Sequence, residues 1–147
     1  MPPITHSATP APPTAVDRQD AVRLNMSFAP HARRVEHLRR IAGALLRQDD
    51  LGTDAIETVQ LLVSEIVTNA VVHGRGERVR FSLAYGRSGF VRIEVDDHSP
   101  APVTVRRPGP DEESGRGLFL VDELSWAWGR RGTRTWCVVA TREVCAP

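Results

Sequence analysis

The stretch Val59–Gly74 reads V-Q-L-L-V-S-E-I-V-T-N-A-V-V-H-G and decides the fold. Apolar residues cover nearly every face of the helix it would form, which predicts a helix substantially buried in the core. Glu65, Asn69 and His73 are set into this stretch at i, i+4 and i+8. At 3.6 residues per turn their side chains project from one face, one above the other.

A carboxylate and an amide on such an apolar helix are unfavourable to bury without partners. Two interpretations satisfy this requirement. Glu65, Asn69 and His73 either line a polar pocket, or form a hydrogen-bonded stripe that joins the helix to a neighbouring element. Their spacing is equally compatible with both.

The elements on either side follow from hydrophobic periodicity. Pro30 suits the first turn of one helix, and Asp54, with Glu57 three positions on, is a good N-cap for the central helix, which runs to His73. The other expected elements are strands over 21–28, 78–85, 90–97, 126–129 and 134–141, and helices over 30–47 and 118–124. Strands joined by short turns predict an α+β fold: a two-layer sandwich of a mostly antiparallel sheet with helices on one face.

The chain has 147 residues, enough for one domain, and a formal net charge of +1. We expect a flexible Pro-rich tail over 1–20, a folded domain over 21–142 and a short tail over 143–147. The first segment has no apolar signal region, and no eighteen apolar residues run together, so the protein is expected to be cytoplasmic, with no membrane partner. Cys137 reads as a small core residue, and nothing requires an oxidising compartment.

Four arginines cluster on the first expected helix, but Glu36 interrupts them. This pattern is more typical of a solvated helix face than of a nucleic-acid-binding patch, although it remains a candidate surface for a protein partner. The four are Arg33, Arg34, Arg39 and Arg40.

Asp97 follows the apolar strand that ends near Val95. A carboxylate at this place can accept a hydrogen bond from an exocyclic amine of a purine ring. Alternatively, Asp96 and Asp97 open a turn, as aspartates often do. A metal site made of Asp96, Asp97 and His98 is disfavoured, because adjacent residues of an extended chain point to opposite faces.

Gly115-Arg116-Gly117 lies between a long loop over 98–114 and a short helix. Glycines let backbone N–H groups approach an anion, and a helix N-terminus adds a favourable dipole. The motif is weak alone, and it is not a Walker A element, which requires G-x-x-x-x-G-K-[ST].

The order of these motifs is more specific than any one of them. E-x-x-x-N-A at 65–70, an apolar strand ending in Asp97, and G-x-G-L at 115–118 together resemble the GHKL ATP-binding fold of gyrase, heat-shock chaperone and histidine-kinase ATPases. The chain looks most like the stand-alone anti-sigma factor serine/threonine kinases of actinomycetes. The phrases L-L-V-S-E-I-V-T-N-A-V-V-H-G, G-R-G-L-F-L-V-D-E-L and G-T-R-T-W-C-V carry the resemblance, which covers 21–142.

The resemblance implies ATP and Mg²⁺ as ligands. Asn69 would coordinate the magnesium ion, and Glu65 would be the general base for attack on the γ-phosphate. His73 would border the phosphates, and Asp97 would bind the adenine amine. The remaining implied nucleotide-binding residues are Gly115, Arg116, Gly117 and Leu118 at the phosphates, and Thr133 or Thr135 on the adenine side.

One part of the family pattern differs. The D-x-G-x-G box, which wraps the nucleotide, is here Asp97-His98-Ser99-Pro100-Ala101, so Ser99 and Ala101 replace both glycines. Where a glycine adopts a positive φ, another residue costs about 1 kcal/mol or more. The hinge of the lid over 99–114 is therefore expected to follow another path.

The resemblance implies a function in transcriptional regulation: phosphorylation of a serine on a small anti-sigma antagonist, sequestration of a sigma factor, or both. Homodimerisation is also possible. The alternative is a nucleotide-binding protein-interaction switch with little or no catalysis. A sensor histidine kinase is not expected, because the order of Glu36 and His37 is reversed relative to a phosphoacceptor motif and the chain is too short for a separate dimerisation module.

Overall fold

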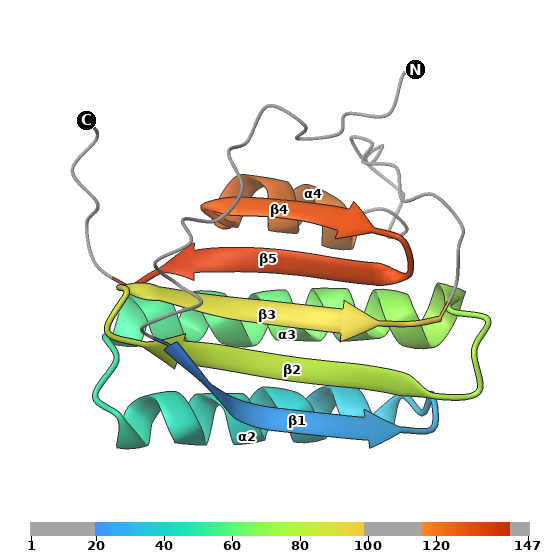
Figure 1. Cartoon of the computed structure of the whole chain (residues 1–147), viewed down its shortest axis with the longest axis horizontal. Helices are drawn as coiled ribbons and strands as arrows, with labels where there is room; N and C mark the ends of the chain where they lie inside the picture. Colours follow the sequence, from blue (N-terminus) through green and yellow to red (C-terminus); the bar gives the residue numbers. More distant parts are fainter. Residues whose placement is uncertain (1–19, 99–115, 142–147) are drawn as a thin grey trace.

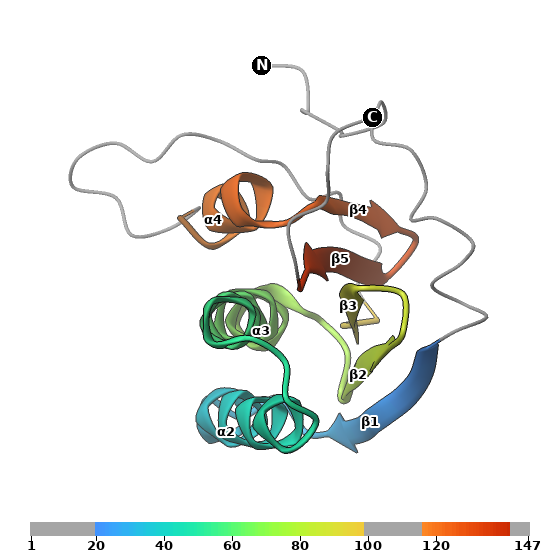
Figure 2. The same ribbon diagram turned by 90° about the vertical axis from the view of Figure 1, so that its left-hand side faces the viewer.

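The computed structural model describes residues 20–98 and 116–141. The elements are β1 (Asp20–Phe28), α2 (Arg33–Gln48), α3 (Thr53–His73), β2 (Val79–Gly86), β3 (Phe90–Asp96), α4 (Arg116–Leu124), β4 (Ala127–Arg131) and β5 (Arg134–Ala140). All strand pairs are antiparallel, in the order β1-β2-β3-β5-β4 (Figure 1). Figure 2 shows α2, α3 and α4 on one face of this sheet, so the expected two-layer α+β fold is confirmed.

The inner face of the sheet follows from the alternation of the strands. Leu83, Ile93 and Cys137 lie side by side across three strands and are each fully buried. Residues one position away are more exposed, which is the period-2 pattern of a sheet covered on one side. Cys137 is a core residue, as its apolar surroundings predict.

Helix α3 is the centre of the helical layer. It contacts α2 on one side, α4 on the other, and the inner face of the sheet below it. Its length and hydropathy would allow it to cross a membrane, but its apolar residues form the domain core, as expected of the central helix of an α+β fold. Those buried residues are Ala55, Ile56, Val59, Leu62, Val63, Ile66, Val67 and Ala70.

Three predicted helix starts are wrong by one to three residues. Helix α2 begins at Arg33 rather than Pro30, because the first turn is closed by hydrogen bonds to His31 and Ala32. Helix α3 begins at Thr53 with Gly52 as its N-cap and no side-chain cap, so Asp54 lies in the first turn instead. Helix α4 begins at Arg116, two residues before the predicted start.

Four strand ends differ from the prediction by one or two residues, and two of them concern the site. Strand β3 ends at Asp96, which leaves Asp97 just beyond the sheet. Strand β4 continues to Arg131 instead of ending at Gly129, because Gly132 adopts a φ of +62° and closes a tight hairpin in which Arg131 pairs with Arg134. The longer strand brings two more arginines, Arg130 and Arg131, into the sheet.

Candidate nucleotide-binding site

Two polar side chains lie among the buried residues in the C-terminal half of α3. Glu65 and Asn69 are half-buried, and neither makes a hydrogen bond or ion pair within 20–98 and 116–141. His73, one turn further on, is exposed. The hydrogen-bonded stripe is therefore not formed among these residues, and the polar pocket stays a prediction. Burial raises the pKa of the Glu65 carboxyl above its ordinary value.

The C-terminal end of α3 lies against the end of β3. A Cβ built on Gly74 would be 3.1 Å from Asp97 Cβ, and one on Gly76 would be 3.0 Å from Asp97 O. This contact brings the C-terminal end of α3 next to the end of β3, and both ends lie on the right in Figure 1. The β4–β5 turn lies on that side as well.

Asp97 is buried and is hydrogen-bonded through both its backbone and its carboxylate. Its backbone N–H donates to Thr133 O at 3.2 Å, which links the end of β3 to the β4–β5 turn. Its carboxylate accepts hydrogen bonds from Arg130, from Nη2 to Oδ1 at 2.9 Å and from Nη1 to Oδ2 at 3.2 Å. Arg130 Nη1 also donates to Thr135 Oγ1 at 2.9 Å. Both predicted threonines thus adjoin Asp97.

Arg130 is the site residue that sequence reasoning missed. The signal was strand alternation: Trp128 pairs with Cys137 and Arg130 with Thr135, so both side chains point to the covered face. A charged residue at an inward position requires a partner. The predicted strand ends at Gly129, one residue before Arg130, so the prediction places Arg130 outside the sheet.

The residues after β3 include one strained position. His98 has a φ of +56°, and its N–H donates to Asp96 Oδ1 at 2.9 Å. Burial alone would raise the pKa of Asp96, but hydrogen bonds from Thr133 and His98, with the charge of Arg134, lower it. Within the described residues no cluster of three potential metal ligands is present. Ser99 and Ala101 lie outside the described residues.

Helix α4 supplies the last predicted component. Gly115 lies outside the described residues, and Arg116 and Gly117 form the first turn of the helix. Leu118 is buried in the core, and the helix packs against α3. The backbone N–H groups of that first turn have no partner within the helix, as at any helix N-terminus, and form a potential anion site beside α3.

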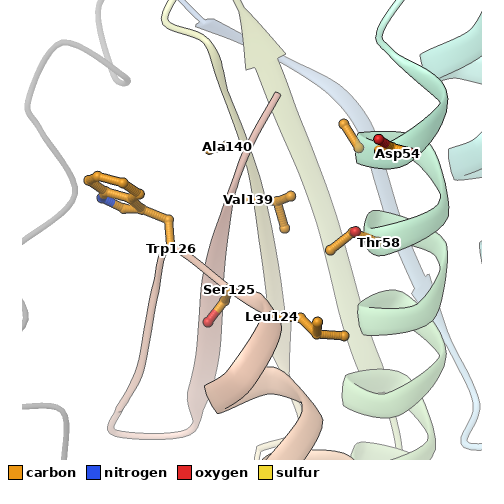
Figure 3. A pocket seen from close by; sticks show the side chains of 8 residues that line it. Asp54, Thr58, Leu124, Ser125, Trp126, Val139 and Ala140 are labelled. Atoms are coloured by element: carbon orange, nitrogen blue, oxygen red, sulfur yellow. The ribbon is translucent and has the colours of Figure 1, made fainter. Parts of the chain in front are cut away.

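A pocket at the other end of α3 is separate from this site. It has a volume of about 290 Å³, and Asp54 and Thr58 of α3 line it together with Leu124, Ser125 and Trp126 (Figure 3). Fifteen residues separate its Asp54 from Asn69 on the same helix, which corresponds to about 22 Å. It shares no residue with the predicted nucleotide contacts.

The five-stranded antiparallel sheet, covered by helices on one face, is the α+β sandwich expected of an ATP-binding domain. Residues 28–141 match the histidine kinase-like ATPase domain, and the chain therefore belongs to this family. Membership supports ATP binding and a regulatory role. The chain is also similar to an uncharacterised protein of Streptomyces coelicolor, with 37% identity over 78 residues, 49% of this chain and 73% of that protein.

Proposed function

We propose that this protein binds Mg·ATP at the C-terminal end of α3 and transfers the γ-phosphoryl group to a serine of a small regulatory protein. The observation that carries this proposal is the pair Glu65 and Asn69. Both are half-buried on an apolar helix without a partner among the described residues. Such placement is unfavourable for stability unless a polar ligand is bound.

The donor groups fit the nucleotide and its metal. The Asn69 amide provides an uncharged oxygen, a ligand type that Mg²⁺ accepts while it keeps several waters. Bound magnesium would neutralise charge on the phosphates. Asp97 would accept the adenine amine with Thr133 or Thr135 beside it, and the N–H groups of Gly115, Arg116, Gly117 and Leu118 would hold the phosphates. His73, at the exposed end of α3, would border them.

Glu65 would act as the general base. Its carboxylate would take the proton of the serine hydroxyl while the serine oxygen bonds to the γ-phosphorus. The bond from that phosphorus to the bridging oxygen would break, and ADP would leave. Burial raises the pKa of Glu65, which makes its carboxylate a stronger base than an exposed glutamate.

The biological setting of the proposal is cytoplasmic control of transcription. The expected partners are an anti-sigma antagonist as the substrate and a sigma factor as the sequestered protein, with homodimerisation possible. Exposed arginines of α2 are the candidate contact surface. Two of them, Arg39 and Arg40, already pair with Glu36, which makes the face less positive than its arginine count implies.

Calorimetric titration with ATP, with and without Mg²⁺, tests the proposal. Asn69→Ala should weaken Mg·ATP binding by about tenfold or more, the loss of one good polar contact. Ser64→Ala is the control, because the Ser64 hydroxyl is on the same helix but bonds to Gln60 O at 3.0 Å. If neither the wild type nor Ser64→Ala binds Mg·ATP, the site is disproved.

Turnover separates the kinase from the switch. The amount of ADP formed should fall at least about a hundredfold in Glu65→Gln while ATP affinity stays nearly constant, because the general base acts only in the chemical step. Magnesium-dependent binding with no ADP formed by the wild type would favour the alternative, a nucleotide-loaded protein-interaction switch.

A further inference from the structure

Arg130 places a positive charge inside the domain. It lies on β4 between the helices and the sheet, with only 10% of its side chain exposed, and the Asp97 side chain beside it is 12% exposed. Removing one member of a buried ion pair of this kind strongly destabilises the folded protein, because the other charge is left buried without compensation. The pair is thus a fixed feature of the chain without nucleotide.

The geometry of the pair is bidentate. Two guanidinium nitrogens meet the two oxygens of Asp97, at 2.9 and 3.2 Å, and one of them also meets Thr135 Oγ1 at 2.9 Å. Charge-assisted bidentate contacts are roughly twice as strong as neutral hydrogen bonds. Arg130 therefore holds both groups that the proposed function assigns to the adenine side of the nucleotide.

An exocyclic amine is a weaker partner for Asp97 than the guanidinium. It is neutral, and it offers one N–H to one oxygen, whereas Arg130 offers a charge and two contacts. The favoured directions for end-on approach to both carboxylate oxygens are already used by Arg130. An adenine amine can take such a direction only when at least one guanidinium contact is released.

From this we infer that Arg130 is a specificity-determining residue that competes with the adenine amine for Asp97. The inference rests on the proposed function, because it presumes that a purine nucleotide binds at Asp97. Its consequence is weak discrimination by the base: the wild-type chain should bind Mg·ATP little better than Mg·purine riboside triphosphate, the same nucleotide without the amine.

Calorimetry with these two nucleotides on the wild type, Arg130→Met and Arg131→Met tests the inference. Arg130→Met should bind Mg·ATP about tenfold more tightly than the wild type, and its affinity for purine riboside triphosphate should change less than about twofold. Arg131→Met is the matched control, since Arg131 is the next residue and exposed. It should leave the ratio of the two affinities unchanged.

Two results would overturn the inference alone. One is weaker ATP binding by Arg130→Met, because Arg130 would then position Asp97 for the amine. The other is an equal change for both nucleotides, which would show no relation between Arg130 and the amine. If neither wild type nor Arg130→Met binds either nucleotide, the proposed function fails, and the inference fails with it.

A measurement on the unmodified chain avoids any loss of folding in Arg130→Met. A guanidinium held by two oxygens rotates slowly, so its nitrogens give separate signals in ¹⁵N NMR. For Arg130, assigned by its absence from Arg130→Lys, these signals should merge on saturation with Mg·ATP and stay separate with purine riboside triphosphate. Separate signals in both complexes would overturn the inference.

Discussion

Gly74, directly after α3, packs closely against Asp97, directly after β3, and a side chain at position 74 would have no space. A Cβ on Gly74 would lie 3.1 Å from Asp97 Cβ and 2.3 Å from the carbonyl oxygen of Ala70. The second distance is far shorter than a normal contact, and a backbone oxygen cannot move aside as a flexible side chain can. A larger residue at position 74 would therefore require the backbone after α3 to shift, next to Asp97.

Gly74→Ala should destabilise the domain by about 2 kcal/mol, because the added methyl group clashes with Ala70 O and the backbone at the end of α3 must shift. It should also weaken Mg·ATP binding more than any loss of folded protein explains. Urea unfolding and calorimetry measure the two effects. Gly52→Ala is the control at the opposite end of α3, where a Cβ would have no neighbour within 4 Å. Equal stability of the two variants would contradict the prediction.

Glu65→Gln should raise the melting temperature at neutral pH. Burial raises the folded-state pKa of Glu65 above 4.5, so the neutral form is favoured in the folded chain. The stability associated with this proton is complete below the unfolded pKa and is lost as the pH rises through the folded pKa. Glutamine keeps the neutral state at every pH.

Melting temperatures of the wild type and Glu65→Gln from pH 4 to pH 8 test this. The difference should be largest near pH 8 and should shrink towards pH 4. A difference that is constant with pH would indicate lost or gained contacts instead of titration.

Tyr85→Phe should destabilise the domain by about 1 kcal/mol. The buried Tyr85 hydroxyl is 2.5 Å from Asp49 Oδ2 and 3.2 Å from Leu45 O, so it ties β2 to the end of α2. Burial, with the Asp49 hydrogen bond, raises the pKa of this phenol. Urea unfolding of Tyr85→Phe, Asp49→Ala and the double variant measures the coupling, and additive effects would contradict it.

Asp50→Gly should stabilise the protein by about 0.5–1 kcal/mol. Asp50 has a φ of +56° directly after α2, where its N–H donates to Arg47 O at 3.1 Å. Glycine adopts this left-handed conformation at a helix end without strain. Asp54→Gly, inside the first turn of α3, should instead destabilise by a similar amount. A loss of stability in Asp50→Gly would show that its side chain outweighs the strain.

The regular elements were predictable because their signals are local. The apolar pattern of α3 and the alternation of β2 and β3 each lie within one segment, so the sheet-and-helix architecture could be derived from periodicity. Their ends were less predictable. Asp54 looked like a cap, but Gly52 holds that position, since a cap is defined by where the backbone turns and not by side-chain type.

The candidate site was predictable in part. Glu65 and Asn69 stood out because they are polar residues on a buried helix, and Asp97 because it follows an apolar strand. The roles assigned to them remain predictions. Arg130 could not be found in this way. Its place in the sheet depends on the extension of β4 beyond Gly129, and its ion-pair partner Asp97 lies 33 positions earlier in the chain.

The amino-acid sequence by itself determined the α+β class, the buried central helix and the polar residues it carries, because hydrophobic periodicity acts over a few neighbouring residues. Only the tertiary structure decided which of those residues share an edge, and that Arg130 holds Asp97. Antiparallel pairing and the Gly74 contact bring together residues that are far apart along the chain. Arg130 and Asp97 are then buried side by side and form a bidentate ion pair, which no local sequence pattern encodes.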